Sequence, residues 1–190
     1  KRSTQIMRYF FILFLILYPF NLYANIKDDL KLKLKETNNV YFKFTQKINK
    51  KMEEGECKIS YPKKIFCKYN DLYEKIIVSN GNSLIINSKK IRNYLNYKIK
   101  DTPLNLILDK NFLLKKLDEI EKVEENNETF YFDITQEKNK ITIYFDKNNY
   151  DIIGWTTLDI YQNKVETKLF DVQTNLMIDE KIFIVQKYLN

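Results

Sequence analysis

The sequence has no histidine, and among its 190 residues are only three glycines, three prolines and two cysteines. Without histidine there is no Ser-His-Asp or Cys-His nucleophile and no His-ligated zinc or haem. Three scattered glycines cannot form a phosphate-binding loop, and two cysteines cannot hold an iron–sulfur cluster or a four-cysteine zinc site. We therefore expect no catalytic residues, no metal and no cofactor.

Basic residues outnumber acidic ones, which gives a formal net charge of +7. Lys1, Arg2 and Arg8 supply three of these charges, and beyond residue 24 the basic residues are lysines except for Arg92. Nucleic-acid sites favour arginine forks and clustered basic patches, so we expect no nucleic-acid partner. The chain is 44% hydrophobic, which is enough for one domain with its own core.

Residues 1–24 have the pattern of an export signal. A basic stretch ends at Arg8, an uncharged apolar run of ten residues occupies 9–18, and the small residue Ala24 follows Pro19. This is the order of a secretory signal peptide, and the run falls short of the roughly 20 apolar residues that a membrane span needs. We expect cleavage after Ala24 and an exported mature chain, residues 25–190, that forms a single domain.

The mature chain combines one long helix with many short strands. Ile26, Leu30 and Leu34 recur at helical spacing and predict an amphipathic helix over residues 25–39. Alternating apolar residues then predict strands at 40–48, 57–61, 65–69, 75–79, 84–87, 91–99, 129–135, 140–145, 152–160, 164–170 and 181–185. Short helices at 104–108 and 112–117 interrupt them. This order predicts a half-closed antiparallel β-barrel with the helices as a lid on one side.

The inner face of this sheet would be bulky and almost free of titratable groups. Its expected members are Phe42, Phe44, Ile59, Tyr61, Tyr69, Ile77 and Leu84. One interpretation is a filled core, because most protein interiors are close-packed. The other is an apolar cavity for a hydrophobic ligand. Periodicity does not separate the two.

Other chemistry is sparse. The acidic residues Glu119, Glu121, Glu124 and Glu125 form a run typical of a solvated surface. Ser60 and Lys63 match an S-x-x-K pattern, but Pro62 lies between them in a predicted strand turn, and the companion motifs of that enzyme class are absent. The sequence therefore does not predict an enzyme.

The order of several short motifs resembles the LolA family of lipoprotein carriers, in particular its alphaproteobacterial members. The resemblance covers about Ile26 to Val185, nearly the whole mature chain. The motifs are the 40–46 segment VYFKFTQ, the glycine-opened strand at 55–59, the Tyr61-Pro62 turn, the 76–81 segment IIVSNG, Thr102-Pro103-Leu104 with 106–108, and Ile153-Gly154-Trp155 with Asp159. Each motif is weak alone, and their shared order behind an export signal carries the resemblance.

The resemblance implies a periplasmic, monomeric carrier that shields lipoprotein acyl chains and moves lipoproteins from the inner to the outer membrane. Its implied partners are acylated lipoproteins, an inner-membrane ABC-type release complex, and an outer-membrane acceptor or the outer membrane itself. The implied cavity and lid residues are Leu30, Leu34, Phe42, Phe44, Ile59, Tyr61, Tyr69, Ile77, Leu84, Leu104, Ile107 and Leu108.

Two local features stand out within the resemblance. Tyr61 occupies the position where the family has an arginine that bonds the lid, so locking would use the tyrosine hydroxyl or be weaker. Cys57 and Cys67 lie on strands joined by the Pro62 turn and would point to the same face. An exported protein could join them as a disulfide or bury them as two small apolar side chains.

Two other functions remain open at this stage. A half-barrel of this kind could carry another lipid or hydrophobic ligand, because a fold does not determine a function. It could also be a domain that senses lipoproteins without transporting them.

Overall fold

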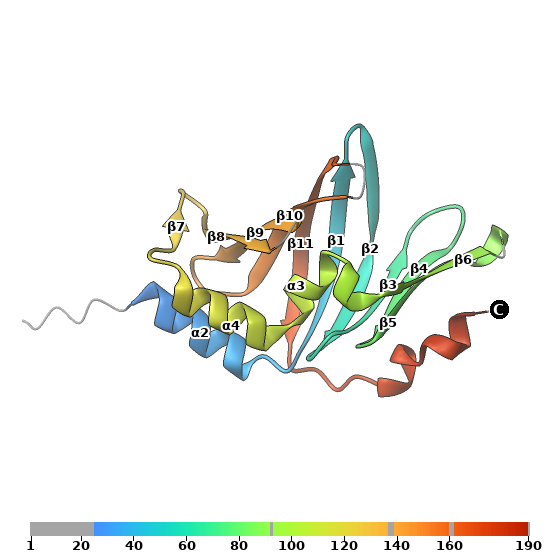
Figure 1. Cartoon of the computed structure of the whole chain (residues 1–190), viewed down its shortest axis with the longest axis horizontal. Helices are drawn as coiled ribbons and strands as arrows, with labels where there is room; N and C mark the ends of the chain where they lie inside the picture. The colour runs from blue at the N-terminus through green and yellow to red at the C-terminus, as the bar shows by residue number, and fades with distance from the viewer. Residues whose placement is uncertain (1–24, 92, 137–138, 160–161, 190) are drawn as a thin grey trace, which may run out of the picture.

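A computed structural model describes residues 25–189 except 92, 137–138 and 160–161. Within these residues eleven strands form one sheet in the order β6-β5-β4-β3-β2-β1-β11-β10-β9-β8-β7 (Figure 1). Every neighbouring pair is antiparallel. The expected signal peptide, residues 1–24, lies outside the described residues.

The sheet is open, because its two end strands, β6 and β7, lie far apart at opposite ends of the molecule (Figure 1). The strands are β1 (Asn39–Ile48), β2 (Lys51–Ser60), β3 (Lys64–Tyr69), β4 (Lys75–Asn80), β5 (Ser83–Ser88), β6 (Asn93–Lys98), β7 (Glu124–Glu125), β8 (Thr129–Gln136), β9 (Asn139–Asp146), β10 (Ile152–Leu158) and β11 (Lys164–Thr174). The predicted fold class, a half-closed antiparallel sheet with helices on one side, is confirmed.

Three helices cover one face of the sheet, which we call the inner face. They are α2 (Ile26–Glu36), α3 (Leu104–Leu108) and α4 (Lys110–Glu119). Asn25 caps α2 by accepting a hydrogen bond from the Lys27 backbone amide, and Asp28 and Asp29 lie in its positively polarised first turn. Leu30 and Leu34 are buried, whereas Leu32 is exposed, as the helical periodicity predicts.

The inner face of the strands and the helices share one large apolar core. Phe42, Phe44, Ile59 and Trp155 on the sheet belong to it, together with leucines of all three helices. Burial alternates along β1, so Phe42 and Phe44 point inward while Lys43 points to solvent. The helices therefore bury the apolar stripe that alternation leaves on this face.

The C-terminal segment was predicted as a strand over 181–185, and this is wrong. It forms two 3-10 helices, η3 (Glu180–Phe183) and η4 (Val185–Tyr188). Val185 packs with Val78 and Ile85 on the outer face of β4 and β5, and the Tyr188 ring lies 5.7 Å from the Phe66 ring, tilted by 40°. The outer face of these strands is itself apolar, and the 3-10 helices pack on it. A strand would instead pair with an edge of the sheet and would leave this face exposed.

No helix in the described part of the chain is long and apolar enough to cross a lipid bilayer.

Candidate ligand cavity

An apolar cavity of about 190 Å³ lies between the inner face and α3. Its walls come from β1, β2, β3, β4, β10 and β11 and from the start of α3. The lining residues are Phe42, Phe44, Gln46, Cys57, Ile65, Cys67, Tyr69, Ile77, Pro103, Leu104, Ile107, Trp155, Thr157, Leu158, Asp159, Val165 and Thr167. Aliphatic and aromatic groups dominate, with a few polar groups at one end, which is the usual make-up of a site for a hydrophobic ligand.

One wall of the cavity depends on a glycine. Gly55 of β2 lies opposite Phe44 of β1, and the Phe44 ring lies over it. A Cβ at Gly55 would lie 2.9 Å from the Phe44 ring and 2.3 Å from the Lys68 carbonyl oxygen. The Phe44 ring in turn meets Tyr69 edge to face, with centroids 5.0 Å apart. Glycine is therefore required at this position for the aromatic wall to form.

The two cysteines form a disulfide in the wall of the same cavity. Cys57 and Cys67 are directly opposite each other in the β2–β3 register. Both are buried, and both line the cavity. The bond ties together two strands of the wall.

A second hollow, beneath α2, is almost completely filled. It measures about 20 Å³, room for roughly one water molecule, and it is lined by Leu34, Ile59 and Tyr61 among others. The α2 side of the interior is thus a packed core, while the α3 side holds a cavity. Both interpretations left open by periodicity apply, each to a different half of the inner face.

The structure distributes the predicted site residues among three environments. Phe42, Phe44, Tyr69, Ile77, Leu104 and Ile107 line the larger cavity. Leu34, Phe42, Ile59, Tyr61 and Ile107 line the small hollow, and Leu30, Leu84 and Leu108 are buried in the core without lining either. Ile107 and Phe42 contact both hollows and lie between them.

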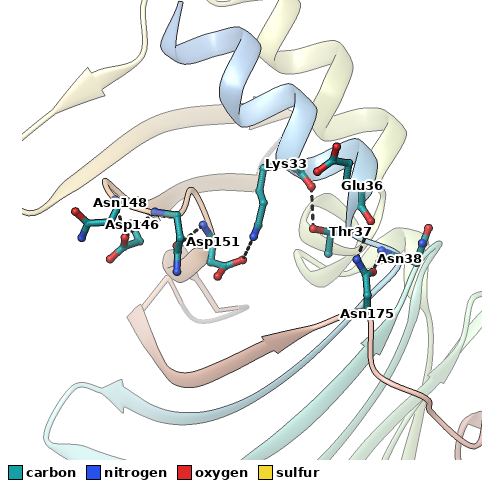
Figure 2. Close-up of polar contacts among 9 residues, drawn as sticks. Lys33, Glu36, Thr37, Asn38, Asp146, Asn148, Asp151 and Asn175 are labelled. Atoms are coloured by element: carbon teal, nitrogen blue, oxygen red, sulfur yellow. Dashed lines mark hydrogen bonds and ion pairs between the residues drawn. The ribbon is translucent and has the colours of Figure 1, made fainter. Parts of the chain in front are cut away.

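Polar contacts join the C-terminal end of α2 to the sheet (Figure 2). Lys33 pairs with Asp151 of the β9–β10 turn at 2.9 Å. Beyond the last strand, the Asn175 amide donates to the Glu36 carbonyl at 3.0 Å and accepts from the Asn38 backbone amide at 2.7 Å. These bonds join the end of α2 to the end of β11.

Lys27 and Lys31 of α2 bond the end of α4, and two more lysines, which the sequence analysis did not identify, bond α3 and α4 elsewhere. Lys63, in the β2–β3 turn, donates its backbone amide to the Leu108 carbonyl at 2.9 Å and pairs with Asp109 at 3.0 Å. The ammonium of Lys110 donates to the carbonyl oxygens of Lys35, at 3.3 Å, and Thr37, at 3.0 Å. We call the contacts of Lys63 and Lys110 the lysine latch.

Tyr61 does not contribute a hydrogen bond to this latch. Its hydroxyl forms none with the described residues, and burial raises its pKa above the ordinary tyrosine value. The Lys110 ammonium lies 5.7 Å from the centre of its ring. Tyr61, at the position where the family that the sequence resembles has a lid-bonding arginine, therefore contributes packing only. Lysines of the neighbouring turn and helix bond the lid instead.

A buried carboxylate lies next to the cavity wall, near Tyr69. Glu53 of β2 points to the inner face beside the cavity and is only 8% exposed. Burial alone would raise its pKa, but ion pairs with Lys51 and Lys75 lower it below the ordinary value. Lys75 also lies 3.7 Å above the Tyr69 ring. Because we predicted that β2 begins at Cys57, Glu53 was missed, although it alternates in phase with Gly55 and Cys57.

The described residues contain no group of three or more carboxylates and cysteines placed to hold a metal ion. The acidic run at Glu119, Glu121, Glu124 and Glu125 is exposed to solvent. Ser60 of the S-x-x-K pattern instead donates its hydroxyl to Glu180 at 3.0 Å.

Comparison with solved structures finds similar chains, all at very low sequence identity. An uncharacterized conserved protein from Thermus thermophilus is 5% identical, with a TM-score of 0.52 over 83% of this chain and 90% of that one. A protein domain from Vibrio parahaemolyticus assigned to outer membrane lipoprotein sorting is 9% identical, with a TM-score of 0.52 over 87% and 97%. A LolA superfamily protein from Nitrosomonas europaea is 8% identical, with a TM-score of 0.46 over 85% and 98%.

Sequence comparison finds no match among curated proteins but does match one family model. The sequence model of the family described as outer membrane lipoprotein carrier protein LolA matches residues 35–186, which is most of the chain and includes the whole cavity wall. The chain therefore belongs to the LolA family.

Proposed function

We propose that this protein is a periplasmic carrier that shields the acyl chains of lipoproteins in its apolar cavity and transfers lipoproteins from the inner to the outer membrane. The observation that supports this most is the unfilled apolar cavity beneath α3, in a chain of the LolA family. The apolar run and small residue of residues 1–24 support export.

The physical need for such a carrier is large. Each methylene transferred from water to an apolar site contributes about 0.8 kcal/mol, so a lipoprotein with several acyl chains does not leave a membrane unaided. A protein interior can supply that environment without catalysis. The residues of the cavity wall bind the acyl chains and exclude water, and no covalent bond needs to be made or broken.

The cavity must enlarge to perform this task. An apolar cavity of roughly 150 Å³ accommodates a molecule the size of benzene, so about 190 Å³ holds only a fragment of an acyl chain. The lysine latch holds α3 and α4 through a few exposed or half-exposed polar contacts, which are individually weak. We infer that α3 and α4 move away from the sheet when cargo enters.

A reconstituted release reaction tests the proposal. The processed protein is mixed with inner-membrane vesicles that contain a tri-acylated lipoprotein and its ABC-type release complex. We expect lipoprotein in the soluble fraction as a one-to-one complex that depends on ATP. If the protein stays empty in this reaction, the lipoprotein proposal is refuted.

The alternatives predict different results in the same experiment. A carrier of another hydrophobic ligand would stay empty here but retain lipid from a total membrane extract, detectable by native mass spectrometry. A sensing domain would bind lipoprotein without passing it to acceptor membranes. A second incubation with outer-membrane vesicles separates transfer from retention.

A further inference from the structure

Charge is strongly separated along the sheet. Residues 74–101, which include β4, β5 and β6, contain six basic residues and two acidic ones, Glu74 and Asp101, and Lys75 pairs with the buried Glu53; the basic residues are Lys75, Lys89, Lys90, Arg92, Lys98 and Lys100. At the other end of the sheet, residues 118–128 around β7 contain six acidic residues and one lysine. Because β6 and β7 are the two end strands, opposite charges lie at opposite ends of the long axis (Figure 1).

The basic end also exposes large apolar side chains. Tyr94 is 46% exposed, Leu95 49% and Ile91 56%, and every residue of β6 is exposed. Register places Leu95 on the inner face beside Ile86, and Tyr94 on the outer face opposite Asn87. Apolar groups therefore project on both sides of this unpaired edge, which lies beyond the reach of α2 and α4 (Figure 1).

Lysines frame this edge at both ends of the strand. Lys89 and Lys90 precede β6, and Lys98 and Lys100 follow it or end it. Lys90 pairs with Glu74 at 3.8 Å, whereas the described residues offer no ion pair to the other three. We call Ile91, Tyr94, Leu95 and Tyr97 with these four lysines the β6 edge.

An apolar row connects the β6 edge to the cavity. Ile77, which lines the cavity, is the register partner of Ile86, and Ile86 is the partner of Leu95. All three side chains are on the inner face. A molecule that leaves the cavity in this direction stays on apolar side chains as far as the edge strand.

We propose that the β6 edge docks the protein on the surface of a lipid bilayer that contains anionic phospholipids. Tyrosines and aliphatic groups bordered by lysines are the composition of interfacial membrane-binding surfaces. Anionic headgroups attract the basic end and repel the acidic end, so the charge separation orients the molecule as it approaches. The bound orientation directs the apolar row, and with it the cavity, toward the membrane. The surface complements the proposed carrier function, but its binding to lipid does not require that function.

Vesicle flotation tests this docking. The protein is isolated from the periplasm, and its intact mass determines the N-terminal residue. Protein without residues 1–24 is used, so that their apolar run does not contribute to binding. It is mixed with vesicles of phosphatidylcholine alone or with added phosphatidylglycerol. We expect binding to the anionic vesicles that weakens as salt increases, and little binding to neutral ones.

Variants assign the binding to the β6 edge. Lys89→Gln with Lys98→Gln should weaken binding to anionic vesicles by roughly 25-fold, about 5-fold for each lysine. Tyr94→Thr with Leu95→Thr, which keeps residues that favour strands, should weaken it by about tenfold. Circular dichroism and thermal melting verify that both variants fold.

A matched control removes the same charge from another exposed hairpin. Lys47→Gln with Lys50→Gln, at the β1–β2 turn, should leave vesicle binding unchanged, and so should Met52→Thr, which removes an exposed apolar side chain there. Equal effects of the control and the β6 variants would overturn the proposal, as would absence of binding to anionic vesicles. Light scattering that shows β6-dependent dimers in place of vesicle binding would assign the edge to a second copy. Lipoprotein release into solution is a separate readout, so failure of docking is distinguishable from failure of the carrier function.

Discussion

A substitution that fills the cavity should weaken ligand binding without lowering the folding stability, because a carrier uses this space to hold its ligand. Val165 of β11 is buried and lines the cavity. Val165→Phe adds four carbons on the inner face, and phenylalanine also favours strands. The change occupies space that a ligand would otherwise use, without removing any polar contact.

The two expected effects have different signs. Burying four more carbons contributes up to about 3 kcal/mol at 0.8 kcal/mol for each methylene, while strain from overpacking costs about 1–3 kcal/mol. The free energy of unfolding should therefore stay unchanged or rise by up to about 2 kcal/mol. The ligand loses room for about four methylenes, which weakens binding by about 3 kcal/mol, or more than a hundredfold.

Thermal unfolding and titration with a fluorescent acyl ligand measure the two quantities on the same protein. Val78→Phe is the matched control, since Val78 is fully buried on the outer face away from the cavity. It should lose about 1–3 kcal/mol of stability and leave the affinity of the folded protein unchanged. If Val165→Phe binds the ligand as tightly as the unmodified protein, the cavity is not the binding site and the reasoning is refuted.

Other parts of the site give three further predictions. Replacing Cys57 and Cys67 with alanine should lower the free energy of unfolding by about 2–3 kcal/mol, since the disulfide closes a loop with a sequence separation of 10 residues. Calorimetry with and without reductant measures this loss. A thermal unfolding transition that reductant does not change in the unmodified protein would contradict the prediction. The lysines lower the pKa of Glu53 below its ordinary 4.5, so its contribution to the free energy of unfolding is present above that pH and is lost as the pH falls below it. Glu53→Gln, which leaves Lys75 without its partner carboxylate, should flatten this dependence of stability on acid pH. Identical profiles of stability against pH for the two proteins would refute the role of the pair. Asp109→Asn keeps an oxygen to cap α4 but removes the ion pair with Lys63 of the β2–β3 turn. Stability should fall by less than about 1 kcal/mol, while acyl-ligand uptake, followed by stopped flow, becomes faster. Unchanged uptake would mean that this contact does not limit lid opening.

Much of the architecture could be predicted from the sequence because its signals are local. Alternation in 40–46 identified the inner-facing phenylalanines, and the helical spacing of Leu30 and Leu34 identified the buried stripe of α2. The turn at Pro62 fixed the register that places Cys57 opposite Cys67. Strong period-two or period-3.6 patterns specify which side chains are buried before any partner is known.

The features that were missed depend on distant partners. Glu53 is buried because Lys75, 22 residues away, pairs with it, and no local pattern shows that pairing. The lysine latch joins Lys110 to backbone oxygens of α2, and backbone acceptors leave no trace in the sequence. The apolar run at 181–185 matches a strand, but its tertiary partner is the outer face of β4 and β5, which favours compact 3-10 turns. The alphaproteobacterial type of the family stays a prediction.

Photo-crosslinking inside the cavity is the most direct test of the central claim. A photoreactive amino acid at Leu104, on the lid side of the cavity, is compared with the same amino acid at Phe170, which is 44% exposed. After irradiation of intact cells, mass spectrometry identifies what each position has captured. The account predicts acylated lipoproteins joined through their acyl chains at Leu104 and none at Phe170. Capture of no acylated lipoprotein at Leu104, or equal capture at both positions, would contradict it.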